Sequence, residues 1–199
     1  MGGDMEDKKL IEILYRRYNQ AALQVAGRQP LAFNREALNA SILNLPIDDL
    51  GFTNFDGTSS TKIELLAHRK DKSKAFDVFR LGRANGRVWE LVVIDGVDVP
   101  HKHLKTDSEL VIFNGGGFVS HNEIWSRYRT TQNIKIDAGT AHGFVTDPRQ
   151  GATVFLSMQP NPIQDPVTRQ EDFVPAGDEF PIPPHFLQWR DDQLAALAA

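Results

Sequence analysis

The sequence contains no cysteine, and this absence removes several classes of chemistry at once. Disulfide bonds, thiolate nucleophiles and cysteine-based zinc sites are all excluded. Any metal ion that this chain binds must therefore be held by nitrogen and oxygen atoms. Because a chain without cysteine is compatible with every compartment, this absence does not place the protein in the cell.

Long apolar runs and an excess of positive charge are also missing. No run approaches the roughly 18–20 apolar residues that a membrane-spanning helix needs, and the acidic N-terminal segment lacks the hydrophobic stretch of a secretory signal. The formal net charge of −4 argues against a nucleic-acid partner, because nucleic-acid-binding domains carry a basic surface. We therefore expect a cytoplasmic protein that binds neither membranes nor nucleic acid.

The 199 residues suit one globular domain with an addition at each end. Residues 1–60 are predicted to form a helical extension, residues 61–160 a β barrel, and residues 161–199 a proline-rich extension packed on the barrel, with a final helix over 185–198. In the N-terminal extension apolar residues recur at helical spacing: Ile11, Leu14, Tyr18, Ala22 and Val25. Its mixed charges favour a cover for the barrel or a dimer contact over membrane binding, and we expect a homodimer.

The central segment changes to a period of two, which indicates strands. The Asn85-Gly86 pair separates two apolar runs, 75–81 and 88–94, and predicts a hairpin. Further short strands are expected near 99–103, 109–113, 117–121, 124–129, 132–136, 142–146 and 152–159. Glycine-rich breaks separate them, and the run Gly115 to Gly117 is interpreted as a tight turn that needs positive φ angles. Many short strands at close spacing predict an antiparallel sandwich or barrel.

The stretch from Pro100 to His142 carries a candidate metal site. His101 and His103 are one residue apart on an expected strand, so their imidazoles point to the same side and are able to share one ion. The carboxylate Glu109 lies six residues after His103, and His142 lies about forty residues after the histidine pair. Asp107 competes with Glu109 as the carboxylate ligand. We prefer Glu109 because it begins an apolar strand.

With these residues the chain resembles the cupin superfamily, whose fold is a jelly-roll barrel, or double-stranded β-helix. The first cupin motif consists of a glycine, a His-x-His pair, a glutamate and a closing glycine, matched here by Gly96, His101, His103, Glu109 and Gly116. The second has a Pro-x-Gly-x-x-His core, matched here by Asp137, Gly139 and His142. The resemblance covers about residues 61–160.

Two positions depart from the cupin pattern. The glutamate usually lies four or five residues after the second histidine, whereas Glu109 lies six after His103. The interval from Glu109 to Gly116 nevertheless fits the family. Asp137 stands where the second motif has proline, which affects a turn and leaves His142 as a ligand.

The resemblance implies a mainly β protein with a metal held by His101, His103, Glu109 and His142. Three imidazoles and one carboxylate suit divalent transition metals, with Fe(II) preferred over Mn(II), Ni(II) or Zn(II). Four ligands leave an octahedral ion one or two open positions. We expect a metal-dependent enzyme for a small polar molecule, foremost an Fe(II) oxygenase of the dioxygenase type. A non-redox isomerase or lyase, and a cupin that binds a small molecule without catalysis, remain open.

One further residue is a catalytic candidate. On the strand over 124–129, Tyr128 and Ser126 share a face, and if that face is interior Tyr128 serves as a substrate contact or proton donor. The opposite face carries Trp125, Arg127 and Arg129. An inward orientation of the arginines would favour an anionic substrate, and an outward one would leave them solvated. Gln159 is a weaker candidate for the pocket.

Overall fold

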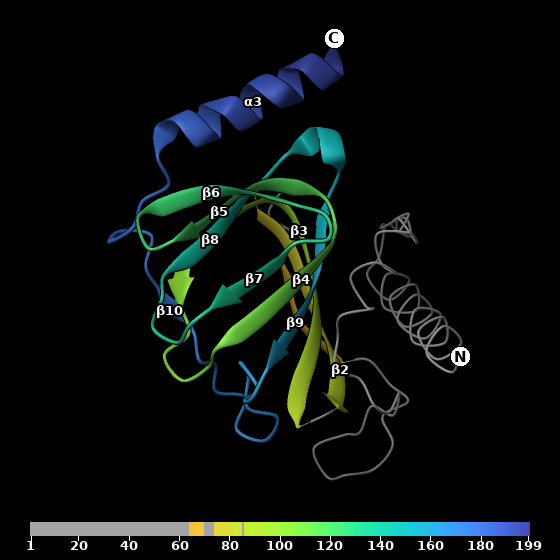
Figure 1. Ribbon diagram of the computed structural model, residues 1–199, viewed down its shortest axis with the longest axis vertical. Helices are drawn as coiled ribbons and strands as arrows, with labels where there is room; N and C mark the ends of the chain where they lie inside the picture. Colours follow the sequence, from red (N-terminus) through yellow and green to blue (C-terminus); the bar gives the residue numbers. More distant parts are fainter. Residues whose placement is uncertain (1–63, 70–73, 85) are drawn as a thin grey trace, which may run out of the picture.

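The computed structural model describes residues 64–69, 74–84 and 86–199, and the described part is built mainly from β-strands (Figure 1). The mainly β prediction is thereby confirmed. The helices predicted within residues 1–60 lie outside the described residues. The elements are β1(Glu64–Arg69), β2(Lys74–Ala84), β3(Arg87–Lys102), β4(Ser108–Asn114), β5(Gly116–His121), β6(Ile124–Arg129), β7(Asn133–Ile136), β8(His142–Thr146), the 3₁₀ helix η1(Pro148–Gln150), β9(Thr153–Gln159), β10(Val174–Pro175) and α3(Pro184–Ala198).

The strands join into one antiparallel sheet that curls around an interior (Figure 1). The order of the main path is β6-β5-β8-β3-β9-β4-β7, with β1 and β2 extending one half and β10 adding to β3. The first half of β3 pairs with β2 and β9, and its second half pairs with β8 and β10. Strand β3 therefore belongs to both walls of the barrel.

Strand β3 is longer than the sequence predicts. Two strands were expected, with a break at Asp95-Gly96, whereas the chain remains extended for 16 residues. At Gly96 the φ angle is +127°, a value that favours glycine and lets the strand change direction without ending. The Thr146 hydroxyl accepts from Gly96 N and donates to Gly96 O, both at 3.0 Å. The Asp-Gly pair thus produces a bend that carries β3 from one wall to the other.

The interior is filled by apolar side chains from both walls. Strand β4 shows the alternation clearly, because Leu110 and Ile112 belong to the interior cluster whereas Glu109, Val111 and Phe113 point to the other side. The interior cluster consists of Val92, Ile94, Leu110, Ile112, Val119, Tyr128, Ile134, Ile136, Phe144 and Phe155. Glu109, Val111 and Phe113 therefore share the outer face of β4.

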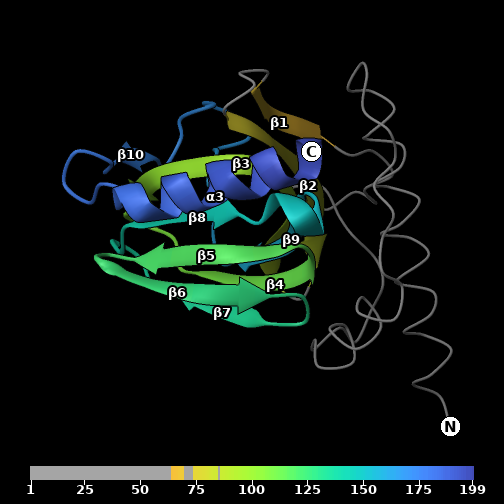
Figure 2. The same ribbon diagram turned by 90° about the horizontal axis from the view of Figure 1, so that it is seen from above.

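The chain beyond residue 160 packs against the barrel, and two of its secondary-structure elements take part. Strand β10 pairs with the end of β3, and the predicted C-terminal helix is present as α3, which lies over β8 and β5 (Figures 1 and 2). Phe186 and Trp189 of α3 pack on Phe118 of β5, with ring centroids 4.5 and 5.0 Å apart. No helix among the described residues is long and apolar enough to cross a membrane.

The glycine run 115–117 supplies a stability prediction. Gly117 has a φ angle of +148°, and a Cβ atom there would lie 2.1 Å from the Val145 carbonyl oxygen. We expect Gly117→Ala to lower the free energy of unfolding by more than about 2 kcal/mol, because the β5–β8 pairing has to shift. Gly86→Ala is the matched control, since its φ is +69° but a Cβ meets nothing within 4 Å; it should cost only about 1 kcal/mol. Equal losses in urea denaturation would contradict this account.

Candidate metal centre

Three imidazoles converge at one end of the barrel interior. His101, His103 and His142 each offer a ring nitrogen, and these atoms all lie within 4.8 Å of one another. The ring centroids are separated by 4.4 to 5.1 Å, and the three residues are 5–8% exposed. Within the described residues, this is the group of side chains suited to hold a metal ion.

The strand geometry explains why these three residues meet. His101 lies near the end of β3 and His103 is the first residue after the strand, and their imidazoles point to the same side, as side chains two residues apart on an extended segment do. His142 is the first residue of β8 and lies opposite His101 in the antiparallel register. Directly opposed residues in neighbouring strands point to the same side of a sheet. Two strands therefore bring the three predicted histidines together.

Each histidine is oriented by a backbone carbonyl. The Nδ1 atoms of His101 and His142 donate to Val99 O at 3.1 Å and Thr140 O at 3.0 Å, and Nδ1 of His103 donates to Asp172 O. A carbonyl oxygen only accepts, so Nδ1 carries the hydrogen in all three rings. The Nε2 atoms are left as lone-pair donors, which is the arrangement of metal-bound histidines. The donor set therefore fits a divalent transition metal.

The C-terminal extension forms part of the site. The Asp172 carboxylate accepts from the backbone N–H groups of Leu104 and Lys105, both at 2.8 Å, which fixes the loop after His103. The next residue, Phe173, stacks on the His101 ring with centroids 4.6 Å apart and an interplanar angle of 25°. The sequence suggests Phe173 only as an apolar anchor and gives no sign of Asp172, because the contact joins residues 69 apart in the chain.

The structure does not place the predicted carboxylate ligand with the histidines. Glu109 Oε2 accepts from Arg87 Nη1 at 2.7 Å, and both side chains are more than a third exposed. Its neighbours Ser108 and Leu110 line the interior cavity, so Glu109 points outward by strand alternation. The competitor Asp107 is exposed and accepts from Ala138 N. The converging ligand set thus consists of three histidines without a carboxylate.

Tyr128 faces the barrel interior, which is one of the two orientations that the sequence leaves open for β6. It does not, however, reach the histidines. Its hydroxyl shares a hydrogen bond of 2.7 Å with Thr153 Oγ1, and its ring meets Phe144 edge-on. Burial raises the pKa of Tyr128. Tyr128 is absent from the cavity lining, so its contacts are those of a core residue. Arg127 and Arg129 are exposed on the opposite face.

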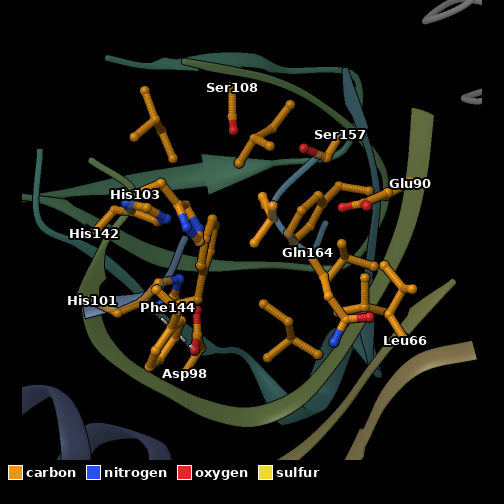
Figure 3. A pocket seen from close by; sticks show the side chains of 18 of the residues that line it. Leu66, Glu90, Asp98, His101, His103, Ser108, His142, Phe144, Ser157 and Gln164 are labelled. Carbon is orange, nitrogen blue, oxygen red and sulfur yellow. Dashed lines mark ion pairs between the residues drawn. The ribbon is translucent and has the colours of Figure 1, made fainter. Parts of the chain in front are cut away.

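The histidines form one end of a cavity with a volume of about 130 Å³ (Figure 3). Its middle is apolar and is lined by Val92, Ile94, Leu110, Ile136, Phe144 and Phe155. Glu90 and Ser157 lie across the cavity from the histidines. Sequence reasoning missed Glu90, because a single glutamate within an apolar strand matches no motif. A charged residue in the middle of a buried run was the available signal.

Comparison with known proteins gives fold relatives only. No protein-family model and no curated protein matches the chain. Among solved structures the chain is similar to KdgF from Halomonas sp., with 16% identity over 56% of this chain and 95% of that chain and a TM-score of 0.42. A cupin 2 conserved barrel domain protein from Rhodopseudomonas palustris has 16% identity, coverage of 56% and 79%, and a TM-score of 0.42. A cupin-2 domain protein from Rhodospirillum rubrum has 19% identity, coverage of 68% and 88%, and a TM-score of 0.45.

The strand order decides the fold, because the curled antiparallel sheet with a histidine-bearing strand shared by both walls is the expected double-stranded β-helix. The described part therefore has the cupin-type fold that the sequence predicts, a double-stranded β-helix. In this cupin barrel, Gly96 of the first motif bends β3 and Gly116 begins β5. Gly139 of the second motif, with a φ of +80°, lies in the turn before His142. The three motif glycines thus lie where the backbone bends or turns or where a strand begins, whereas Glu109 does not take the position expected of a metal ligand.

Burial affects the protonation of two of the histidines. It lowers the pKa of His103, and burial together with the neighbouring His101 and His103 imidazoles lowers the pKa of His142 well below its ordinary value. Neutral imidazoles are the form that binds metal. The lowered pKa values therefore keep His103 and His142 neutral in solution that is acidic enough to protonate an ordinary histidine.

Metal affinity tests the ligand set directly. We expect His101→Ala, His103→Ala and His142→Ala each to lower metal affinity by more than about 100-fold, because losing a ligand exceeds the 10–100-fold cost of losing a supporting contact. Glu109→Ala is the matched control and should retain affinity, since its carboxylate pairs with Arg87. Competition with a chromophoric chelator measures each constant. Loss of metal in Glu109→Ala together with retention in a histidine variant would overturn the assignment.

The lowered histidine pKa values predict an acid-sensitive metal-free protein. Below the ordinary value of 6.5 the unfolded chain takes up protons at His103 and His142 that the folded chain does not. The free energy of unfolding should therefore fall as the pH drops from about 7 to about 5. Urea denaturation of the metal-free protein at a series of pH values measures this slope. The slope should be shallower in His142→Phe, and an unchanged slope would contradict the prediction.

Proposed function

We propose that the protein is a metal-dependent enzyme for a small polar molecule, and specifically an Fe(II) oxygenase of the dioxygenase type. The observation that carries this proposal is the convergence of three buried imidazoles, each held at Nδ1 by a backbone carbonyl so that Nε2 is left as a donor. The nearby carboxylate of Asp98 lies on the Nδ1 side of His101, at 3.6 Å, and does not belong to the converging group. Three neutral nitrogen ligands suit Fe(II), and they leave three positions of an octahedral ion open.

Three open positions suit oxygenase chemistry better than the one or two left by a four-ligand shell. His101, His103 and His142 would hold the ion and would leave room at it for a chelating substrate and for dioxygen. When bound, Fe(II) supplies the electrons that activate dioxygen, and in a dioxygenase both oxygen atoms end in the product, so that no external reductant is consumed.

The protein's own residues provide orientation and exclusion of water. The carbonyls of Val99, Thr140 and Asp172 fix the three rings, so the ligands need little reorganisation when substrate enters. Phe173 covers the His101 ring, and the apolar middle of the cavity leaves few groups to hold water. A dry cavity strengthens the interactions of a polar substrate and protects reactive species from side reactions.

Metal analysis combined with oxygen uptake tests the function. Protein purified without chelators should contain iron, and candidate substrates that carry a chelating group should be consumed with one dioxygen each in an oxygen-electrode assay. His142→Ala should lose both iron and uptake, whereas the matched control Glu109→Ala should keep both. Turnover without oxygen consumption, with Mn(II), Ni(II) or Zn(II) bound, would replace the oxygenase by a non-redox isomerase or lyase. Ligand binding without any turnover would indicate a binding cupin.

A further inference from the structure

The cavity has two chemically different ends. The histidines form one end, and Glu90 and Ser157 form the other, across an apolar middle (Figure 3). Glu90 lies on the first half of β3, opposite Ser157 of β9 in the strand register. Glu90, Val92 and Ile94 alternate along the strand and share its interior face. Because β3 bends at Gly96, the same strand supplies the Glu90 carboxylate at one end of the cavity and His101 at the other, with His103 directly after the strand.

A hydrogen-bond network holds Glu90 in place. Gln159 Nε2 donates to Glu90 Oε2 at 2.8 Å, and Gln159 Oε1 accepts from Ser157 Oγ at 2.8 Å and from Ser108 Oγ at 3.4 Å. The serine hydroxyls therefore orient the Gln159 amide so that its NH₂ group faces Glu90. Glu90 and Gln159 are 1% and 0% exposed. Gln159, a weak candidate from the sequence, thus acts behind the cavity wall and supports Glu90.

This network leaves part of the hydrogen-bonding capacity of the Glu90 carboxylate unused. Its Oε1 atom has only a long contact of 3.5 Å with Arg80, which also pairs with Glu64 at 3.3 Å. A carboxylate offers about four acceptor positions, so Glu90 keeps acceptor capacity toward the cavity that it lines. A buried carboxylate is costly unless its hydrogen bonds are completed. Burial correspondingly raises the pKa of Glu90, and a ligand that donates a hydrogen bond would offset part of this cost.

We propose that Glu90, with Ser157 beside it, forms a specificity-determining subsite that binds a hydroxyl group at the end of the substrate distal to the metal. The proposal rests on the function proposed above. It defines the substrate class as a small molecule with a metal-chelating group at one end, a short apolar body and an alcohol or phenol hydroxyl at the other. A neutral hydroxyl suits the subsite better than an ammonium group, because the Arg80 guanidinium already lies beside Glu90.

Hydroxamic acids with and without a terminal hydroxyl provide the probes. Alkyl hydroxamic acids of increasing chain length and their ω-hydroxy counterparts are titrated into the Zn(II)-loaded protein by calorimetry. At the chain length that spans the cavity, the hydroxy compound should bind about tenfold more tightly than its alkyl partner, equivalent to about 1.4 kcal/mol. Glu90→Met should abolish this preference, and Ser157→Ala should reduce it. Glu64→Gln is the matched control, because Glu64 also pairs with Arg80 but is absent from the cavity lining, and it should keep the preference.

The outcomes separate this subsite from the metal centre. Acetohydroxamic acid is too short to reach Glu90, so its affinity and the zinc content should be unchanged in every folded variant. If the wild type binds neither zinc nor acetohydroxamic acid, the proposed function fails and the subsite with it. If both bind but no chain length shows a hydroxyl preference, the subsite alone is overturned. Circular dichroism shows which of Glu90→Met and Ser157→Ala folds. If a folded variant keeps the full preference for the hydroxy compound, the subsite is also overturned.

Discussion

The backbone pairing of β3 is the constraint on which the rest of the structure depends. One strand forms hydrogen-bonded ladders with β2 and β9 in one wall and with β8 and β10 in the other. Its bend at Gly96 is fixed by the Thr146 hydroxyl. This continuity sets the relation between Glu90 and His101 through one continuous strand rather than through loop placement. Sites built on strands are held more tightly than sites built on loops.

The sequence was informative about features whose interacting residues lie close together along the chain. The β2–β3 hairpin, the histidine pair and the C-terminal helix follow from local rules of turn conformation, strand alternation and helical spacing. Strand alternation places Glu109, Val111 and Phe113 on one face of β4. It could not say which face was interior, because both faces of β4 carry buried apolar residues. The ion pair with Arg87, which favours the outward orientation, depends on tertiary structure.

The parts that sequence reasoning missed depend on distant contacts. Asp172 reaches His103 from 69 residues away, and Gln159 reaches Glu90 across the same separation. No periodic pattern encodes such pairs. The predicted break at Asp95-Gly96 failed for a related reason, since the partners that keep the strand extended, β8 and β9, come much later in the chain. The homodimer and the domain boundaries stay predictions.

The contact between Asp172 and His103 has a consequence for the order of events during synthesis. All three histidines and the strands that carry them have been translated once the ribosome has passed residue 159. At that stage the His103 ring lacks its acceptor and the loop after it lacks the Asp172 carboxylate. The three histidines therefore reach their final orientation only after the segment around β10 has left the ribosome and settled against β3.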